Sequence, residues 1–565
     1  MARCFQKRPI GRLAVPGLLA LLLCAASARA RMETTVALDP DALAKITVGS
    51  CFDNVALAGY APIDVTINNH SGESRKWVLE FSSPAYSYGG GDTAVSSFTV
   101  TVEDNGTRTI PLLVPTTDSA NGQMPVRVRI TGYGAEDTVE QEIGGRSSNW
   151  KQVPPFVAIS ESLGNSGWSD LTNRLSGKGK DLVGSTVNPD DLPEDWRGLS
   201  GVAALWLTGD EFNRLDAVQR DAIETWVHTG GVLMLCGAAN IPKEVRFAGF
   251  GQVRLLPAKL DVAATAGTIK EMPAPEREMD ALGSPERAAL AQVTPEVPLL
   301  STFMAVFAVV IGPLNIYALA RRRPERLFWT TPLISLGASG LLMGMIVLQD
   351  GVGGHGMRSA VVCVFPESRN EVVAQEQLSR TGLLLGAAFQ VRDPSCIEQL
   401  GIDTHESPGY ATETKGRELR TDGTAYSKDW FSSRSAQAQR IVTVTPTRAE
   451  ITLVNAGDVA AGAAPVIVSS FEATLDTLYY TGANQQTWVG KNILTGQRNT
   501  LQLVAADASI VRPPYVPGDT LRDFAGQPGS FWATASNSGD YVATLGSIRW
   551  KDQPVSYIGP VTTNP

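Results

Sequence analysis

Two long apolar segments constrain this chain more than any other feature of its sequence. Residues 297–320 and 327–349 carry no charged side chain. At about 1.5 Å per helical residue, each is long enough to cross a hydrocarbon core of about 30 Å. The short sequence RRRPER separates them. We therefore expect residues 297–349 to form a transmembrane hairpin.

The loop of the hairpin and the N-terminus of the chain predict the same orientation. Cytoplasmic loops are enriched in arginine and lysine, and the loop contains Arg321, Arg322, Arg323 and Arg326. Residues 1–30 combine a basic front, an apolar run and an A-x-A site, which is typical of a secretory signal peptide. An uncleaved N-terminal anchor is the alternative. Both large domains should then lie outside the plasma (inner) membrane, in a multi-pass protein.

The second apolar segment carries three glycines on one helical face, Gly337, Gly340 and Gly344. Small residues let two helices approach closely, so this face packs either against the first span or against the helix of a partner protein. Neither segment contains Asp, Glu, Lys, Arg or His. A path for protons or ions through this chain alone is therefore not expected.

Charge and cysteine usage exclude several classes of function. The net charge of -9 gives no basic face for phosphate, so we expect no nucleic-acid partner. Beyond the signal peptide the cysteines are Cys51, Cys236, Cys363 and Cys396. The last two lie in one predicted domain and could pair in an oxidising compartment. No CxxC motif or Cys/His cluster exists, and we expect neither a metal nor a cofactor.

Residues 31–150 show the alternation of a half-buried sheet. Apolar and polar residues alternate in runs such as PIDVTINN (62–69) and KWVLEF (76–81), with Gly, Asn and Asp between the runs. This pattern indicates an Ig-like β-sandwich.

Residues 151–260 have a different pattern. The continuous apolar runs at 201–208 and 231–236 read as buried strands. Between them, residues 215–226 place apolar side chains at helical spacing, and Gly230-Gly231 ends the helix. Strand, helix and strand in alternation predict a parallel α/β layer.

Two sequences within these regions resemble a known family. They are LWLTGDEFNRLDAVQRDAIETWVHTGGVLMLCG (205–237) and GPLNIYALARRRPERLFWTTP (312–332). Both are similar to uncharacterised bacterial membrane proteins that carry a class I glutamine amidotransferase-like, flavodoxin-like extracytoplasmic domain. In such proteins a β-sandwich, this domain and membrane helices occur together. The resemblance implies a flavodoxin-like fold for 151–260.

The remaining regions are less distinctive. Residues 261–296 lack clear periodicity and read as a linker that leads into the membrane. Residues 350–565 return to strand patterns, so we expect a β-rich extracytoplasmic domain, built as a second sandwich. Its polar segment 401–435 reads as a long surface loop. The whole chain is thus expected to be a multidomain α+β membrane protein.

Cys236 is the first catalytic candidate. Active class I amidotransferases place a cysteine on a tight G-x-C-x-G turn, with a His and a Glu downstream. Here the local sequence is MLCGA, His228 precedes the cysteine and the next histidine, His355, follows the membrane segments. We expect Cys236 to be a core residue, with a nucleophilic role as the alternative.

Asp210 and Glu211 form the second candidate, because they follow an apolar strand at the edge where α/β sheets bind ligands. We expect them to hold a ligand or cation, to cap the next helix or to lie in solvent. The acidic segment 188–196 lacks EF-hand spacing. A set of aromatic residues suggests a glycan-stacking or protein-binding platform, or simply core packing. Its members are Tyr86, Tyr88, Trp430, Tyr479, Tyr480 and Trp488.

These observations favour a membrane-anchored extracytoplasmic binding or scaffold protein with a catalytically degenerate amidotransferase-like domain. Its expected partners are the membrane, a protein of the envelope and a glycan. One alternative is an accessory subunit of a membrane transport or envelope assembly complex. The other is an envelope hydrolase that uses Cys236 or the pair Asp210 and Glu211.

Overall fold

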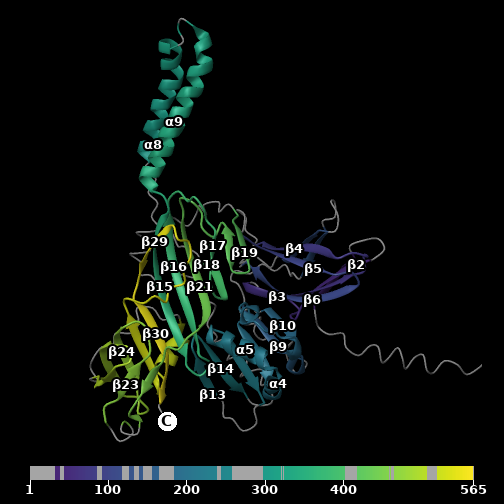
Figure 1. Cartoon of the computed structure of the whole chain (residues 1–565), viewed down its shortest axis with the longest axis vertical. Helices are drawn as coiled ribbons and strands as arrows, with labels where there is room; N and C mark the ends of the chain where they lie inside the picture. Colours follow the sequence, from purple (N-terminus) through teal and green to yellow (C-terminus); the bar gives the residue numbers. More distant parts are fainter. Residues whose placement is uncertain are drawn as a thin grey trace, which may run out of the picture.

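The fold was analysed in a computed structural model of the chain (Figure 1). The described residues are 32–37, 43–56, 58–84, 92–117, 126–132, 139–143, 155–164, 183–237, 244–256, 297–319, 321, 323–400, 416–456, 459, 463–504 and 518–563. The predicted signal peptide and the predicted linker 261–296 lie outside these residues. The fold is mostly β-sheet with few helices, which confirms the β-rich, multidomain class in this coarse form.

Two sheets form the N-terminal sandwich. One has four antiparallel strands in the order β1 (Met32–Ala37), β2 (Ala44–Ser50), β3 (Gly59–Asn69) and β6 (Gly106–Thr116). The other contains β5 (Thr93–Val102), β4 (Arg75–Pro84), β7 (Val126–Thr131) and β8 (Val139–Ile143). Alternate residues point inward along these strands, so Ile63, Trp77 and Val128 meet in one buried core.

The second sheet of the sandwich does not end with N-terminal residues. Three strands from residues 389–428, which follow the helical hairpin in the chain, extend it to seven described strands: β17 (Phe389–Gln390), β20 (Ala425–Lys428) and β19 (Glu418–Asp422). Strand β19 lies parallel to β5, and Leu419 pairs with Ala94. Residues 418–422 and 425–428, which we expected to be part of a surface loop, therefore belong to the N-terminal sheet. Residues 401–415 lie outside the described residues.

The described residues between 155 and 256 form an α/β layer with one six-stranded sheet. Its strand order is β10 (Val183–Val187), β9 (Phe156–Ser160), β11 (Ala204–Thr208), β12 (Val232–Cys236), β14 (Gly251–Leu256) and β13 (Glu244–Ala248). All neighbours are parallel except the edge pair of β13 and β14. The described helices are α2 (Glu161–Gly164), α4 (Gly209–Arg214), α5 (Ala217–His228), η1 (Pro189–Asp191) and η2 (Trp196–Leu199). The buried strands are almost wholly apolar, as parallel strands require.

The described strands of the C-terminal module, where we expected a second sandwich, form one connected, branched sheet of thirteen strands. The main path runs β18 (Ser395–Leu400), β21 (Ala436–Pro446), β16 (Asn370–Thr381), β15 (Gly354–Phe365), β30 (Val555–Thr563), β28 (Ser530–Ala535), β24 (Leu475–Thr481), β25 (Thr487–Ile493) and β27 (Gln502–Leu503). The branches are β22 (Ile451–Leu453), β23 (Val466–Ser469), β26 (Arg498–Thr500) and β29 (Ile548–Asp552). A short helix, α11 (Gly518–Ala525), packs beside β28.

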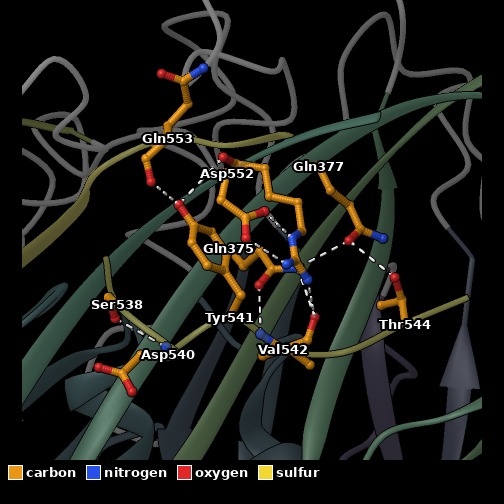
Figure 2. A network of polar contacts seen from close by, with 10 residues as sticks. Gln375, Gln377, Ser538, Asp540, Tyr541, Val542, Thr544, Asp552 and Gln553 are labelled. Atoms are coloured by element: carbon orange, nitrogen blue, oxygen red, sulfur yellow. Dashed lines mark hydrogen bonds and ion pairs between the residues drawn. The ribbon is translucent and has the colours of Figure 1, made fainter. Parts of the chain in front are cut away.

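A polar network holds the irregular segment 536–547 against this sheet (Figure 2). The side chain of Gln375 accepts a hydrogen bond from the backbone N–H of Val542 at 2.7 Å and donates one to Gln377 at 3.0 Å. Arg358 forms a two-point ion pair with Asp552, at 2.8 and 2.9 Å. Since Gln375 and Gln377 are fully buried, their mutual bonds satisfy groups that water cannot reach.

The modules interlock through shared cores. One buried cluster takes side chains from the sandwich, the α/β layer and the C-terminal module, among them Phe52, Tyr60, Phe156, Trp226 and Cys396. A second cluster places Phe247 and Phe250 of the α/β layer against residues of β15 and α11. These cores join the sandwich, the α/β layer and the C-terminal module into one body.

An apolar helical hairpin stands out from one end of this body (Figure 1). It consists of α8 (Val297–Val309), the π-helix η3 (Val310–Leu319), η4 (Pro324–Arg326) and α9 (Leu327–Asp350). Pro313 lies inside the π-helix. Its ring lacks an N–H and therefore interrupts the hydrogen bonds of a regular α-helix. Both arms are long and apolar enough to cross a membrane.

The two helices of the hairpin meet through polar side chains rather than through glycines. Asn315 is 1% exposed; its amide donates to Thr331 at 3.0 Å and its carbonyl oxygen accepts from Thr330 at 2.7 Å. A methyl group added at Gly337, Gly340 or Gly344 would meet no atom within 4 Å. The use of this glycine face for packing inside the hairpin is therefore not seen.

Cys363 and Cys396, which the sequence left open as a pair, are both free thiols. Cys363 packs with Phe365 and Trp532, whereas Cys396 packs in the cluster shared by all three modules. Burial raises the pKa of both thiols well above the usual range.

The interface of the sandwich and the α/β layer generates a first prediction. Gly59 and Gly72 both have positive φ, +79° and +84°. A Cβ at Gly59 would lie 2.5 Å from Ser200 Oγ and 2.8 Å from the backbone N of Gly201, whereas one at Gly72 would meet nothing. Gly72→Ala should cost about 1–2 kcal/mol through its backbone alone. Gly59→Ala should cost a further 1–3 kcal/mol, roughly, by overpacking.

Chemical unfolding of the two purified variants in detergent measures this difference. Equal losses of unfolding free energy for Gly59→Ala and Gly72→Ala would show that the close approach at Gly59 does not exist.

Candidate functional site

The carboxyl ends of three parallel strands converge on one edge of the α/β sheet. Strand β9 ends at Ser160, β11 at Thr208 and β12 at Cys236, and Thr208 and Cys236 are paired in register. The order of the parallel strands reverses between β9 and β11, because β10 follows β9 on one side and β11 lies on the other. Open α/β sheets bind ligands at such a point. We therefore take this edge as the candidate functional site.

Glu211 lies at the centre of this edge. Its Oε1 accepts hydrogen bonds from Ser160 Oγ at 2.6 Å and from Ser162 Oγ at 2.7 Å. Its Oε2 accepts from the backbone N–H of Thr208 at 2.8 Å, and Thr208 Oγ1 in turn accepts from the N–H of Glu211. Thr208 and Glu211 thus form a reciprocal capping box at the start of α4.

The electrostatics of Glu211 follow from these contacts. Burial alone raises the pKa of its carboxyl group, but the hydrogen bonds from Ser160, Thr208 and Ser162 outweigh burial and leave the pKa below its usual value. Glu211 is therefore an anion whose oxygens are engaged by its own chain. Asp210 is exposed, and its backbone carbonyl accepts from Arg214. The two acids do not form a joint ligand pair.

Cys236 lies beneath the same edge. It is 1% exposed and packs with Val157, Trp206 and Met234 on one face of the sheet. Burial, and then the charge of Glu211, raise the pKa of its thiol to about 11. A thiolate, which is the nucleophilic form, is therefore strongly disfavoured at neutral pH.

His228 does not approach Cys236. Helix α5 packs through Trp226 and Val227 on the other face of the sheet, with Leu205 and Leu233. The ring of His228 stacks on Phe365 of β15, with centroids 3.7 Å apart. Burial lowers the pKa of His228 to about 4, so the ring is neutral. His228 thus joins the α/β layer to the C-terminal module.

The other described candidate residues take part in helix caps, ion pairs or core packing. In the acidic segment 188–196, Asn188 and Asp195 cap two short helices, and Asp195 pairs with Arg197 at 2.7 Å. Within the described ranges, no group of three or more His, Cys, Asp or Glu side chains could hold a metal ion. Trp430 and Tyr480 are buried, and Tyr479 stacks on Trp532. Tyr86 and Tyr88 lie outside the described residues.

Sequence reasoning missed Ser160 and Ser162, which supply two of the bonds to Glu211. A usable signal existed, because Ser160 ends a buried apolar strand at the same sheet edge and Ser162 follows it by two residues.

The site generates a second prediction, on neighbouring acids. Glu211→Gln should destabilise the protein by about 1–3 kcal/mol at neutral pH, because it weakens charge-assisted bonds to Ser160, Ser162 and Thr208. Since the folded pKa of Glu211 is lowered, its contribution is complete above the usual value of 4.5 and is lost as the pH falls through the folded pKa. The control Asp210→Asn, at an exposed position, should change stability by less than about 0.5 kcal/mol.

Denaturant unfolding of both variants and the parent between neutral and acidic pH tests this. A loss for Glu211→Gln that persists unchanged at acidic pH would contradict the proposed role of the carboxylate.

No protein-family model matches the chain, and no curated protein does. Among solved structures, a Paenibacillus sp. cycloisomaltooligosaccharide glucanotransferase is 14% identical, over 33% of this chain and 27% of that one, with a TM-score of 0.15. A GH20 exo β-N-acetylglucosaminidase from Vibrio harveyi is 9% identical over 43% and 37%, with a TM-score of 0.11. A β-glucuronidase from glycoside hydrolase family 2 is 9% identical over 91% and 61%, with a TM-score of 0.18. TM-scores this low establish neither fold nor activity for this chain.

Proposed function

We propose that this protein is a membrane-anchored binding or scaffold protein, with its large modules on the outer side of the plasma membrane. In this proposal the α/β module is an amidotransferase-like domain without catalytic activity. The observation that carries it is the contrast between an interlocked body and one apolar hairpin that stands alone from that body.

The exposure of the hairpin supports a membrane anchor. The apolar windows Ser301–Ala318 and Pro324–Met345 are only 6% and 0% buried inside the protein. A core helix of a soluble protein would be mostly buried, because exposing so much apolar surface to water is costly. Trp329 is 76% exposed near the turn, as aromatic residues at a membrane interface are. The arginines of the turn favour its placement in the cytoplasm.

The strand order supports the amidotransferase-like assignment of the α/β module. Numbered along the chain, the parallel strands β10, β9, β11, β12 and β14 follow the order 2-1-3-4-5, which is that of flavodoxin-like folds. Fold alone does not imply activity. Cys236 and His228 lie on opposite sides of the sheet, and Glu211 caps a helix, so the module has the parts of a binding domain without a nucleophile and base in contact.

Membrane topology generates a third prediction. The described thiols are buried, and Cys236 has a raised pKa, so they should react slowly with a membrane-impermeant maleimide. Glu103 and Arg323 are both exposed, in the sandwich and in the turn of the hairpin respectively. Glu103→Cys should label in right-side-out membrane vesicles, and Arg323→Cys only in inverted vesicles. Labelling is measured above that of the parent chain.

Labelling of both variants from the same side would exclude the proposed hairpin topology. Fast labelling of Cys236 in the folded parent chain would count against an inactive module.

An accessory subunit of a membrane complex is the second candidate, and one observation favours it. Gly337, Gly340 and Gly344 leave open space on α9 instead of packing inside the hairpin. A partner helix could approach the backbone closely at such a face.

This candidate generates a fourth prediction. Replacing both Gly340 and Gly344 with Leu should remove a membrane partner from crosslinked complexes, because the added side chains keep the helices apart. Gly312→Leu is the matched control, since Gly312 also faces open space but lies on the other arm. Partners are identified after crosslinking in intact cells. Recovery of the same partners with the double variant would rule out docking at this face.

A further inference from the structure

An apolar loop lies where the helical hairpin joins the outer body. Strand β15 begins at Gly354, shortly after α9 ends, and Gly354 pairs with Thr381 at the end of β16. Because the two strands are antiparallel, β16 runs toward the hairpin, and the residues after Thr381 lie on its side of this pair. Figure 1 shows β17, which follows these residues, at the same end of the body. We call residues 383–388, with the sequence LLLGAA, the base loop.

Backbone hydrogen bonds connect the base loop directly to the end of α9. The N–H of Leu383 donates at 3.0 Å to the carbonyl oxygen of Gly351, the first residue after α9. The N–H of Gly382 donates to the carbonyl oxygen of Gly353 at 2.7 Å, and the N–H of Gly353 donates to that of Leu383 at 3.0 Å. Leu384 packs against a buried cluster that includes residues of β17 and β29. The base loop is therefore fixed beside the hairpin.

The base loop and its neighbour Val352 expose apolar side chains to an unusual degree. Leu385 is 88% exposed, and Val352, which forms a bridge with Leu383, is 61% exposed. Among the other large apolar side chains described outside the hairpin, the most exposed are Val218 and Leu503, each at 54%. Single exposed apolar residues are common on protein surfaces, but here the two most exposed lie close together beside two apolar helices. Covering both from water would stabilise the protein.

The length of α9 places the base loop at the surface of the membrane. The 24 residues of α9 extend about 36 Å at about 1.5 Å per residue, whereas the hydrocarbon core is about 30 Å thick. If the turn of the hairpin lies at the cytoplasmic surface, the other end of α9 reaches the outer headgroups. The base loop is bonded to that end. Its apolar side chains therefore lie at the boundary between headgroups and acyl chains, where interfacial protein segments insert.

The charges around the base loop are compatible with lipid phosphates. The segments that meet at the base of the hairpin contain no acidic residue; they are 351–358, 380–389, 432–436 and 547–551. Arg549 of β29 is exposed and is in register with His355 of β15. The acids next to these segments in the sequence are Asp350 and Asp552, and Asp552 forms an ion pair with Arg358. A lipid phosphate at this surface therefore meets cations such as Arg549.

From these observations we infer that the base loop, together with Val352, inserts into the outer leaflet of the membrane that the hairpin spans. Lipid is the occupant of this apolar surface because the surface adjoins the lipid-facing end of α9 and has no acid to repel phosphate. The inference rests on the proposed anchoring of the chain in the plasma membrane. It adds a second contact with the bilayer, and two contacts fix the orientation of the body on the membrane.

The fifth prediction tests this with the full chain in lipid nanodiscs. Leu385→Cys is labelled with the fluorescent dye NBD, and the lipids carry a nitroxide quencher at a shallow or a deep position of the acyl chain. Because Leu385 is 88% exposed, its replacement has little packing to disrupt. The shallow quencher should remove about half of the fluorescence and the deep quencher much less, since interfacial segments insert only about 5–10 Å.

Two control positions separate this inference from the proposed anchor. Leu336 is 73% exposed within α9, so Leu336→Cys reports on the hairpin and should be quenched most by the deep quencher. Val218 is an exposed apolar residue of α5, which lies well away from the hairpin in Figure 1. Neither quencher should affect Val218→Cys. The parent chain, taken through the same labelling, gives the background from the native thiols.

Each outcome supports or overturns the inference. Quenching at Leu385→Cys and Leu336→Cys but not at Val218→Cys supports it. Quenching at Leu336→Cys alone would show that the loop does not touch lipid, and would leave the anchor intact. Absence of quenching at Leu336→Cys would overturn the anchor and the inference together.

Two further outcomes would also overturn the inference. Equal quenching at Leu385→Cys and Val218→Cys would mean that contact with lipid is not specific to the base loop. Blue-shifted emission of Leu385→Cys in native membranes, without quenching in nanodiscs, would assign the apolar surface to a protein partner instead of lipid.

Discussion

The parallel pairing of β19 with β5 is the interaction on which the arrangement of the sandwich and the C-terminal module depends. It joins residues 325 positions apart, and Arg417 reinforces it through Asp92. Asp422 adds a further bond by accepting from the backbone N–H of Ser97 at 2.8 Å. Strand pairing covers the edge of β5, which would otherwise expose its backbone groups.

A body joined in this way is compatible with the binding or scaffold function that we propose. The stacked rings of His228 and Phe365 fix the α/β layer against β15, and the cluster around Tyr60 fixes it against the sandwich. His228, the histidine nearest to Cys236 in the sequence, therefore lies in the contact between two modules. At the sheet edge, Glu211 is likewise bound by Ser160, Ser162 and Thr208. The polar groups of this edge stabilise the module itself.

The sequence predicted the elements that depend on residues close together in the chain. The parallel layer follows from apolar runs such as Val232–Cys236, and the hairpin from two uncharged segments. The capping role of Glu211 was one of three predicted alternatives, and the spacing of Thr208 and Glu211 is that of a capping box. By contrast, nothing in the polar sequence of β19 indicated its partner. Only Leu419 and Thr421 are buried in it, and the partner strand lies hundreds of residues away. The stacking of His228 on Phe365 could not be predicted either, because the two residues are far apart in the chain.

Native-state hydrogen exchange tests most directly whether the sandwich and the C-terminal module form one body. The amides of β5 (Thr93–Val102) and β19 (Glu418–Asp422) are the ones to compare. If the shared sheet joins the modules, both sets of amides should exchange with the same free energy of opening and the same denaturant dependence. Exchange of the β19 amides at a much lower free energy, while the β5 amides stay protected, would show two modules that meet without being joined.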